Sequence, residues 1–94
     1  MKVAFLGSVE ESFVEYVQKL GYETEKISKE DIKNNNYSRD FEILCGSMLF
    51  DRIDLSEFEN LKYIFLYSQG IDYLPLDYIK EKGIILCNNK GAYA

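Results

Sequence analysis

Few residues of this chain have side chains that could carry acid–base, nucleophilic or metal chemistry. The 94-residue sequence contains no histidine and only two cysteines, Cys45 and Cys87. Histidine titrates near neutral pH and is the commonest metal ligand, so its absence removes the usual general base and the usual zinc ligand together. Both cysteines end apolar runs, where a cysteine usually behaves as a small hydrophobic side chain. The sequence therefore predicts no catalytic residue, no metal site and two reduced thiols.

Three short segments that follow apolar runs could instead bind a ligand through the backbone. They are Gly7-Ser8-Val9, Gly46-Ser47-Met48 and Ser68-Gln69-Gly70-Ile71-Asp72. The first lacks the Gly-x-Gly-x-x-Gly spacing of a dinucleotide site. Glu10 and Glu11 follow it at the start of an expected helix, where carboxylates repel a phosphate. We interpret the first segment as a structural turn and keep the other two as candidate binding loops.

Charge and hydropathy exclude other classes of partner. The chain has 16 acidic and 11 basic residues and a net charge of −5, so its surface repels nucleic acid. No apolar run approaches the ~18 residues of a membrane span. The apolar part of Met1–Gly7 is shorter than the ~7–15-residue core of a signal peptide. We therefore expect a cytoplasmic domain that binds neither nucleic acid nor a membrane.

The elements that would position these loops alternate along the chain. Five apolar runs predict strands: Val3–Leu6, Tyr22–Ile27, Phe41–Cys45, Tyr63–Tyr67 and Ile84–Cys87. The last three are nearly continuous, which is typical of parallel strands covered by helices on both faces. Strands that alternate with helices predict an α/β domain, a flavodoxin-like doubly wound five-stranded parallel sheet in the order 2-1-3-4-5. Such sheets bind ligands beyond the carboxyl ends of their strands, where the candidate loops would lie.

Helices are expected in the intervening segments. One apolar stripe with a 3.6-residue period consists of Val9, Phe13, Tyr16, Val17 and Leu20. Ser8 and Glu11 have the spacing of a capping box at the start of this helix. A second helix is expected at Pro75–Lys82, with proline in its first turn. Shorter helical turns are expected at Lys29–Lys33 and Asp54–Phe58.

Residues 61–94 carry the most specific pattern in the chain. They contain Leu61-Lys62, a strand, Gly70-Ile71-Asp72, a short helix, and then Gly83-Ile84-Ile85-Leu86-Cys87-Asn88-Asn89-Lys90-Gly91. This pattern resembles the D-isomer-specific 2-hydroxyacid dehydrogenases. The substrate domain of that family has Leu-Lys, a strand, a small-x-Gly-Val/Ile-Asp turn, a short helix and Gly-Ile-x-Val-x-Asn-x-x-Gly. Residues 1–60 agree only in the order of their elements and in Asp54-Leu55 ahead of the Leu-Lys pair.

The resemblance implies a function divided between two domains. In that family, the flavodoxin-like domain offers backbone amides to the carboxylate of a small 2-hydroxy or 2-oxo acid. The matching loop here is Ser68-Gln69-Gly70, and Gly46-Ser47-Met48 would form the opposite wall. NAD and the catalytic arginine, glutamate and histidine belong to a second domain, which would follow a hinge helix just after Ala94. We therefore expect residues 1–94 to be a substrate domain, truncated before the hinge, inactive alone and without a cofactor of its own.

A second interpretation stays open. A free-standing flavodoxin-like binding or regulatory module could use the same loops to hold a small acid or a protein partner. The gene downstream of Ala94 separates the two: about 200 further residues with Gly-x-Gly-x-x-Gly opening a helix favour the enzyme, and a stop codon favours the module.

Self-association is also expected from the sequence. Ile84–Cys87 is apolar although the strand order places it at a sheet edge, and Met48-Leu49-Phe50 is apolar although it lies in a loop. Both segments should be covered in a complete enzyme, so contact between copies would hide them.

Overall fold

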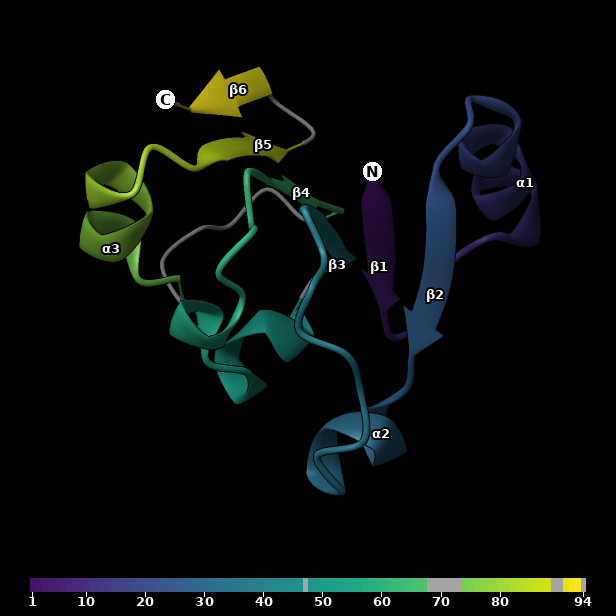
Figure 1. Cartoon of the computed structure of the whole chain (residues 1–94), viewed down its shortest axis with the longest axis horizontal. Helices are drawn as coiled ribbons and strands as arrows, with labels where there is room; N and C mark the ends of the chain where they lie inside the picture. The colour runs from purple at the N-terminus through teal and green to yellow at the C-terminus, as the bar shows by residue number, and fades with distance from the viewer. Residues whose placement is uncertain (47, 68–73, 89–90, 94) are drawn as a thin grey trace.

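The computed structural model describes residues 1–46, 48–67, 74–88 and 91–93 (Figure 1). The elements in chain order are β1 (Lys2–Leu6), α1 (Glu11–Lys19), β2 (Glu23–Ile27), α2 (Lys29–Lys33), β3 (Ile43–Gly46), the 3₁₀ helices η1 (Met48–Arg52) and η2 (Leu55–Glu57), β4 (Tyr63–Leu66), α3 (Leu76–Glu81), β5 (Ile85–Asn88) and β6 (Gly91–Tyr93). Strands β1 to β5 are parallel and lie in the order β2-β1-β3-β4-β5. The predicted five-stranded parallel sheet and its order are confirmed.

A sixth strand, which the sequence analysis did not predict, extends this sheet. Strand β6 is antiparallel to β5, with Leu86 opposite Tyr93 and Cys87 opposite Ala92. A strand of three residues is too short to show a hydrophobic period in the sequence. Because β6 pairs with β5, the apolar run at Ile84–Cys87 does not form the outer edge of the sheet. One of the two surfaces predicted for self-association is thus already occupied by the chain itself.

The two faces of the sheet are covered unequally. Helix α1 lies on one side, and α3 and the 3₁₀ helices lie on the other (Figure 1). The larger core cluster is on the α3 side and consists of Ala4, Leu6, Ile27, Phe41, Leu44, Phe50, Leu55, Phe58, Leu61, Ile64, Leu66, Leu74, Ile79, Ile84 and Leu86. The cluster on the α1 side contains Val3, Phe5, Val14 and Cys45. Most of the hydrophobic stabilisation therefore comes from the α3 side, since it scales with the apolar area removed from water.

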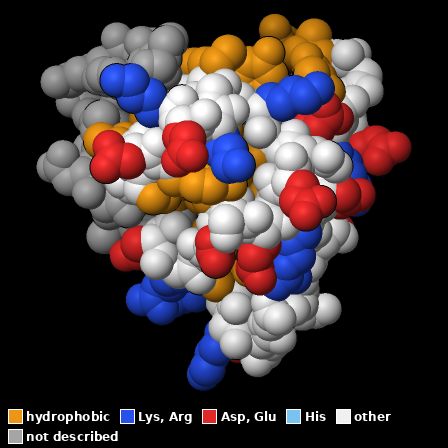
Figure 2. All heavy atoms as spheres, turned by 60° about the vertical axis from the view of Figure 1, so that its left-hand side comes forward, with side chains coloured by type: hydrophobic (Ala, Val, Ile, Leu, Met, Phe, Trp, Pro, Cys, Tyr) orange, Lys and Arg blue, Asp and Glu red, His pale blue; other side chains and the backbone are white. Residues whose placement is uncertain are grey.

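Two residues of the segment Met48-Leu49-Phe50, namely Leu49 and Phe50, pack into or against the larger cluster. Phe50 is 2% exposed, and Leu49 packs against the same cluster. The expectation that this loop leaves a bare apolar surface is wrong for these two residues, because η1 folds back over the sheet. The side chains that face water around α3 and β5 include charges of both signs, with hydrophobic side chains at the top of the view in Figure 2.

Helix α1 differs from the sequence prediction in the residue at which it starts and in the residues that it buries. The N-cap is Glu10, which has no side-chain capping bond, so the capping box predicted for Ser8 and Glu11 does not form. Gly7 has φ +78°, and its amide donates a 2.9 Å hydrogen bond to the carbonyl of Ile27. This bond holds Gly7 beside the last residue of β2, so the helix begins only after it. A capping box forms instead at α2, where Ser28 and Asp31 exchange side-chain and backbone hydrogen bonds.

The buried residue of α1 is Val14 rather than the whole predicted stripe. Tyr16 and Leu20 are 60% and 58% exposed, and Phe13 is 36% exposed. Helix α1 therefore rests on the sheet by Val14, which is outside the predicted stripe, and by the partly buried Val17 of that stripe, whereas Tyr16 and Leu20 of the stripe are exposed. Tyr16 therefore belongs to the predicted apolar stripe but not to the core.

The two cysteines are free, as predicted. Cys45 on β3 and Cys87 on β5 both pair with Phe65 of β4, which lies between them. Two strand spacings amount to about 9–10 Å, beyond the about 7 Å between Cα atoms that a disulfide can bridge.

Candidate functional site

The candidate loops begin at one edge of the sheet. Because β1, β3 and β4 are parallel, their carboxyl ends meet there, and the register places Gly46 directly beside Leu66. Of the six residues predicted to bind substrate, Gly46 closes β3 and Met48 begins η1. Ser47, Ser68, Gln69 and Gly70 lie outside the described residues. The structure thus brings together the points from which both predicted loops start.

Gly46 lies where no side chain fits. A Cβ atom at this position would lie 2.9 Å from the Cβ of Leu6 and 3.2 Å from the Cε2 of Phe50. Its carbonyl oxygen accepts a 2.8 Å hydrogen bond from the amide of Tyr67. This bond joins the residue that ends β3 to the residue that follows β4, so the starts of both loops are held together.

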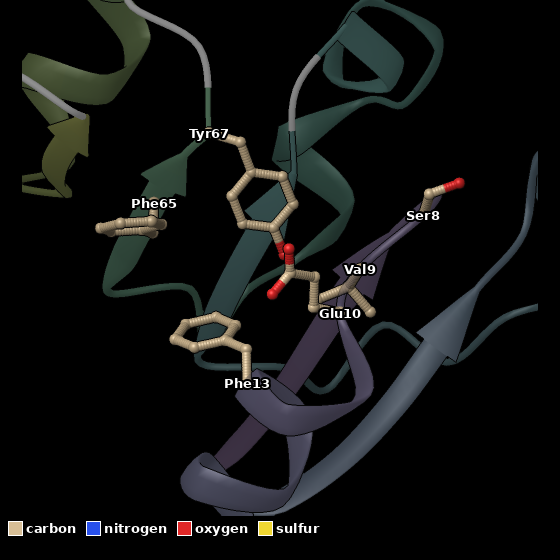
Figure 3. Close-up of a pocket in the computed structure, with 6 residues that line it drawn as sticks. All are labelled: Ser8, Val9, Glu10, Phe13, Phe65 and Tyr67. Atoms are coloured by element: carbon tan, nitrogen blue, oxygen red, sulfur yellow. The ribbon is translucent and has the colours of Figure 1, made fainter.

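A hollow of about 400 Å³ opens beside this edge, on the α1 side of the sheet (Figure 3). Its lining residues are Ser8, Val9, Glu10, Phe13, Phe65 and Tyr67. The rings of Phe65 and Tyr67 meet edge to face with centroids 6.1 Å apart, and those of Phe13 and Phe65 are 6.5 Å apart. The sequence predicts only a structural turn at Ser8 and Val9 and gives no signal for this hollow, because its aromatic residues come from two segments far apart in the chain, α1 and the region of β4.

The charge of this hollow does not suit an acidic ligand. Among the described residues that line it, Glu10 is the one acidic or basic side chain, and its carboxylate would repel a second carboxylate. Burial raises the pKa of the Tyr67 hydroxyl above its usual range, and nearby Cys45 adds to that shift, so Tyr67 is neutral at physiological pH. A separate hollow of about 520 Å³ has three basic side chains, Lys29, Lys33 and Arg52, and one acidic side chain, Glu30, in its lining, so its net charge suits an anion better.

The described residues offer neither a thiolate at Cys45 nor a metal site. Burial raises the pKa of the Cys45 thiol to about 12, so it is not a thiolate at neutral pH. Among the described residues there is no group of three or more His, Cys, Asp or Glu side chains that could hold a metal ion. Within the same ranges no helix has the length and hydropathy needed to cross a bilayer.

Comparison with known protein families identifies the family of this chain. The family model described as D-isomer specific 2-hydroxyacid dehydrogenase, catalytic domain, matches residues 3–94. The chain belongs to this dehydrogenase family. The resemblance seen over residues 61–94 therefore extends over nearly the whole chain. A comparison with curated proteins gave no match.

Solved structures of similar fold are about three times longer than this chain. D-lactate dehydrogenase from Salmonella is 25% identical to this chain with a TM-score of 0.57, and the match covers 94% of this chain and 29% of the Salmonella protein. NAD-dependent formate dehydrogenase from Staphylococcus aureus, in complex with NAD, is 16% identical with a TM-score of 0.71, over 94% and 32%. An NAD⁺-bound 3-phosphoglycerate dehydrogenase from Entamoeba histolytica is 22% identical with a TM-score of 0.70, over 94% and 32%. The last two show the fold alone, and the chain spans less than a third of each of the three.

The described residues of this dehydrogenase domain do not fit NAD. The one turn that leads from a parallel strand into a long helix starts at Gly7, whose amide is already bonded to Ile27. A Cβ atom at Gly7 would lie 3.0 Å from the Cδ1 of Leu49, so this glycine makes room for η1 rather than for a pyrophosphate. Glu10 caps α1 and Glu11 lies in its first turn, which gives the helix start a negative charge. We therefore derive no step that involves the cofactor from these residues.

Proposed function

We propose that this chain is the substrate domain of an NAD-dependent D-2-hydroxyacid dehydrogenase and holds the carboxylate of a small 2-hydroxy or 2-oxo acid. In this proposal the amides of Gln69 and Gly70 donate to the carboxylate, and Gly46, Ser47 and Met48 form the opposite wall. The single observation that carries the proposal is the family match over residues 3–94. The shared edge of β3 and β4 supports it, because both loops start from adjacent, hydrogen-bonded residues.

We propose further that the chain alone does not turn over substrate. NAD, when bound by the rest of such an enzyme, supplies the hydride transfer. The proton that accompanies the hydride needs a donor with a pKa near the working pH. This chain has no histidine, the Cys45 thiol keeps its proton because its pKa is raised to about 12, and the pKa of Tyr67 is raised as well. The domain therefore contributes binding and orientation, and acid–base chemistry comes from outside it.

The affinity of the isolated domain should be low. Two charge-assisted hydrogen bonds contribute about 3–6 kcal/mol together. Loss of translational and rotational freedom costs about 4 kcal/mol or more. The difference is close to zero, so the dissociation constant should be about millimolar or weaker.

An amide chemical-shift titration with a short 2-oxo acid tests this proposal. We expect weak, saturable shifts confined to residues 46–48 and 68–71, and no such shifts with the methyl ester of the same acid, which lacks the carboxylate. Micromolar binding, or shifts centred on Gly7-Ser8 or on the Lys29, Lys33 and Arg52 hollow, would show that the assigned site is wrong. In the same samples, oxidation of NADH by the 2-oxo acid should not exceed the buffer rate.

A further inference from the structure

The hollow between α2 and η1 gathers positive charge in a chain that is acidic as a whole. Its lining consists of Lys29, Glu30, Ile32, Lys33 and Arg52 around a volume of about 520 Å³. Three basic side chains and one acidic side chain give this lining a net charge of +2, whereas the whole chain has a net charge of −5. Its volume falls within the ~300–1,000 Å³ range of small-molecule sites. The loops proposed to hold the 2-oxo acid do not line it.

Packing against the core brings the two walls of this hollow together. Ile32 of α2 and Ile53, which follows Arg52 at the end of η1, both pack against the larger core cluster. Lys29 and Lys33 lie on the same short helix as Ile32. Because α2 follows β2 and η1 follows β3, both walls lie at the edge of the sheet where the parallel strands end (Figure 1). Segments that are separate in the sequence thus present their basic side chains to one space.

The basic side chains of this hollow are not neutralised by ion pairs. Within the described ranges, Lys29, Lys33 and Arg52 form no ion pair, and Glu30 forms none with any of them. Lys29 and Lys33 are four residues apart on α2, a spacing at which like charges repel each other. Arg52 adds a third positive charge from the other wall. An anion placed among these groups turns their mutual repulsion into a shared attraction.

We propose that this hollow binds the phosphate group of a small soluble ligand, which is inorganic phosphate or a phosphate monoester. A phosphate group carries about 1.5–2 negative charges near neutral pH and has several acceptor oxygens, so it meets all three basic side chains better than a monocarboxylate does. The guanidinium of Arg52 can donate a pair of parallel hydrogen bonds to it, and the lysines act as point charges. The bound phosphate bridges α2 and η1. The acidic surface of the rest of the chain disfavours the long phosphate backbone of a nucleic acid.

The exposure of the site and the charge of Glu30 limit its affinity. Lys29, Lys33 and Arg52 are exposed, so water and salt weaken their attraction for an anion. The carboxylate of Glu30 lies in the same lining and repels a phosphate. We therefore expect a dissociation constant of about 1–10 mM at low ionic strength. Removal of the Glu30 charge should tighten binding, and removal of the basic side chains should weaken it.

Amide chemical-shift titrations of the 94-residue chain with inorganic phosphate and with glycerol 2-phosphate, at constant ionic strength, test the proposal. We expect saturable shifts confined to residues 28–34 and 51–53 with both probes, and binding of acetate at least about threefold weaker because it carries a single charge. Tighter binding of glycerol 2-phosphate than of inorganic phosphate assigns the site to a monoester. Equal or weaker binding of glycerol 2-phosphate assigns it to the free ion.

Two double variants of equal net charge separate this site from the overall charge of the chain. Lys33→Gln/Arg52→Gln removes one basic side chain from each wall and should weaken phosphate binding about fivefold or more. Lys19→Gln/Lys80→Gln removes two exposed basic side chains from the last turns of α1 and α3, outside the hollow, and should change the affinity less than about twofold. Glu30→Gln should tighten binding about two- to fivefold.

Every substituted residue is exposed, and far-UV circular dichroism will check that each variant is folded. Equal weakening by the two double variants, or wild-type affinity of Lys33→Gln/Arg52→Gln, overturns the proposal. So do equal affinities for acetate and phosphate, weaker binding by Glu30→Gln, and the absence of saturable shifts up to about 50 mM phosphate, well above the expected dissociation constant. None of these results bears on the proposed substrate loops, because the 2-oxo acid titration reads the amides of residues 46–48 and 68–71.

Discussion

Replacement of Gly46 by alanine is the most direct test of how the binding edge is built. The new Cβ atom would lie 2.9 Å from the Cβ of Leu6, 3.3 Å from the backbone oxygen of Leu6 and 3.2 Å from the Cε2 of Phe50. The first two atoms belong to β1 and cannot move unless the strand moves. The third belongs to a ring that is 2% exposed and has little room to turn.

The expected cost follows from these contacts. Overpacking of a filled core typically costs about 1–3 kcal/mol. Alanine also restricts the unfolded chain, which offsets about 0.4–1 kcal/mol of that cost. We therefore expect Gly46→Ala to lower the free energy of unfolding by about 1–2 kcal/mol, a large part of the about 5–14 kcal/mol expected for a domain of this size.

Urea denaturation followed by far-UV circular dichroism measures this cost, with Gly21→Ala as the matched control. Gly21 has φ +95° and no atom within 4 Å of an added Cβ, so its substitution reports backbone strain without crowding. Adding Phe50→Leu to each variant separates the two causes. It should reduce the cost of Gly46→Ala by about 0.5 kcal/mol or more, because contacting sites couple, and leave that of Gly21→Ala unchanged. A Gly46→Ala variant as stable as the wild type, or equal coupling at both glycines, would refute the packing argument.

Two further predictions concern charge and thiol reactivity. Hydrogen bonds from the backbone and side chain of Ser28 hold the pKa of Asp31 below its usual value, so the folded state favours the ionised carboxyl and its stabilisation is present above the unfolded pKa. Asp31→Asn should therefore be less stable than the wild type at neutral pH, and the difference should shrink as the pH falls through the lowered pKa of Asp31; a difference that grows in acid would contradict this. Cys87, which is half-buried, should react with iodoacetamide at pH 8 well before the buried Cys45, whose pKa is raised to about 12. Peptide mapping by mass spectrometry checks the order, and first modification of Cys45 would contradict it.

The sheet could be predicted from the sequence because its signals are local and agree with one another. Continuous apolar runs such as Phe41–Cys45 are typical of strands in a covered parallel sheet, and the alternation with helices leaves few connections between parallel strands. The same reasoning places both candidate loops at one edge, because parallel strands share a direction. The dehydrogenase family could be identified from residues 61–94, where the order and spacing of short motifs do not depend on the fold.

The start and phase of α1 were decided by tertiary contacts. Ser8 and Glu11 satisfy the local rule for a capping box, yet the hydrogen bond from Gly7 to Ile27 delays the helix until Glu11. The period of the stripe is correct, but a period alone does not say which part of the stripe meets the sheet. Val17 of the stripe packs there together with Val14, which is outside the stripe, and Tyr16 and Leu20 remain exposed.

What the sequence by itself determined is therefore the strand order, the free cysteines and the family. Only the tertiary structure decided that β6 covers the edge of β5, that Gly46 is packed under Phe50, and that Tyr63 and Ile85 stay more than a third exposed on the α1 side. The physical reason is the distance along the chain over which each kind of signal acts. Strand and motif patterns arise from neighbours within a few residues, whereas coverage of a sheet face depends on where whole elements lie relative to one another in space.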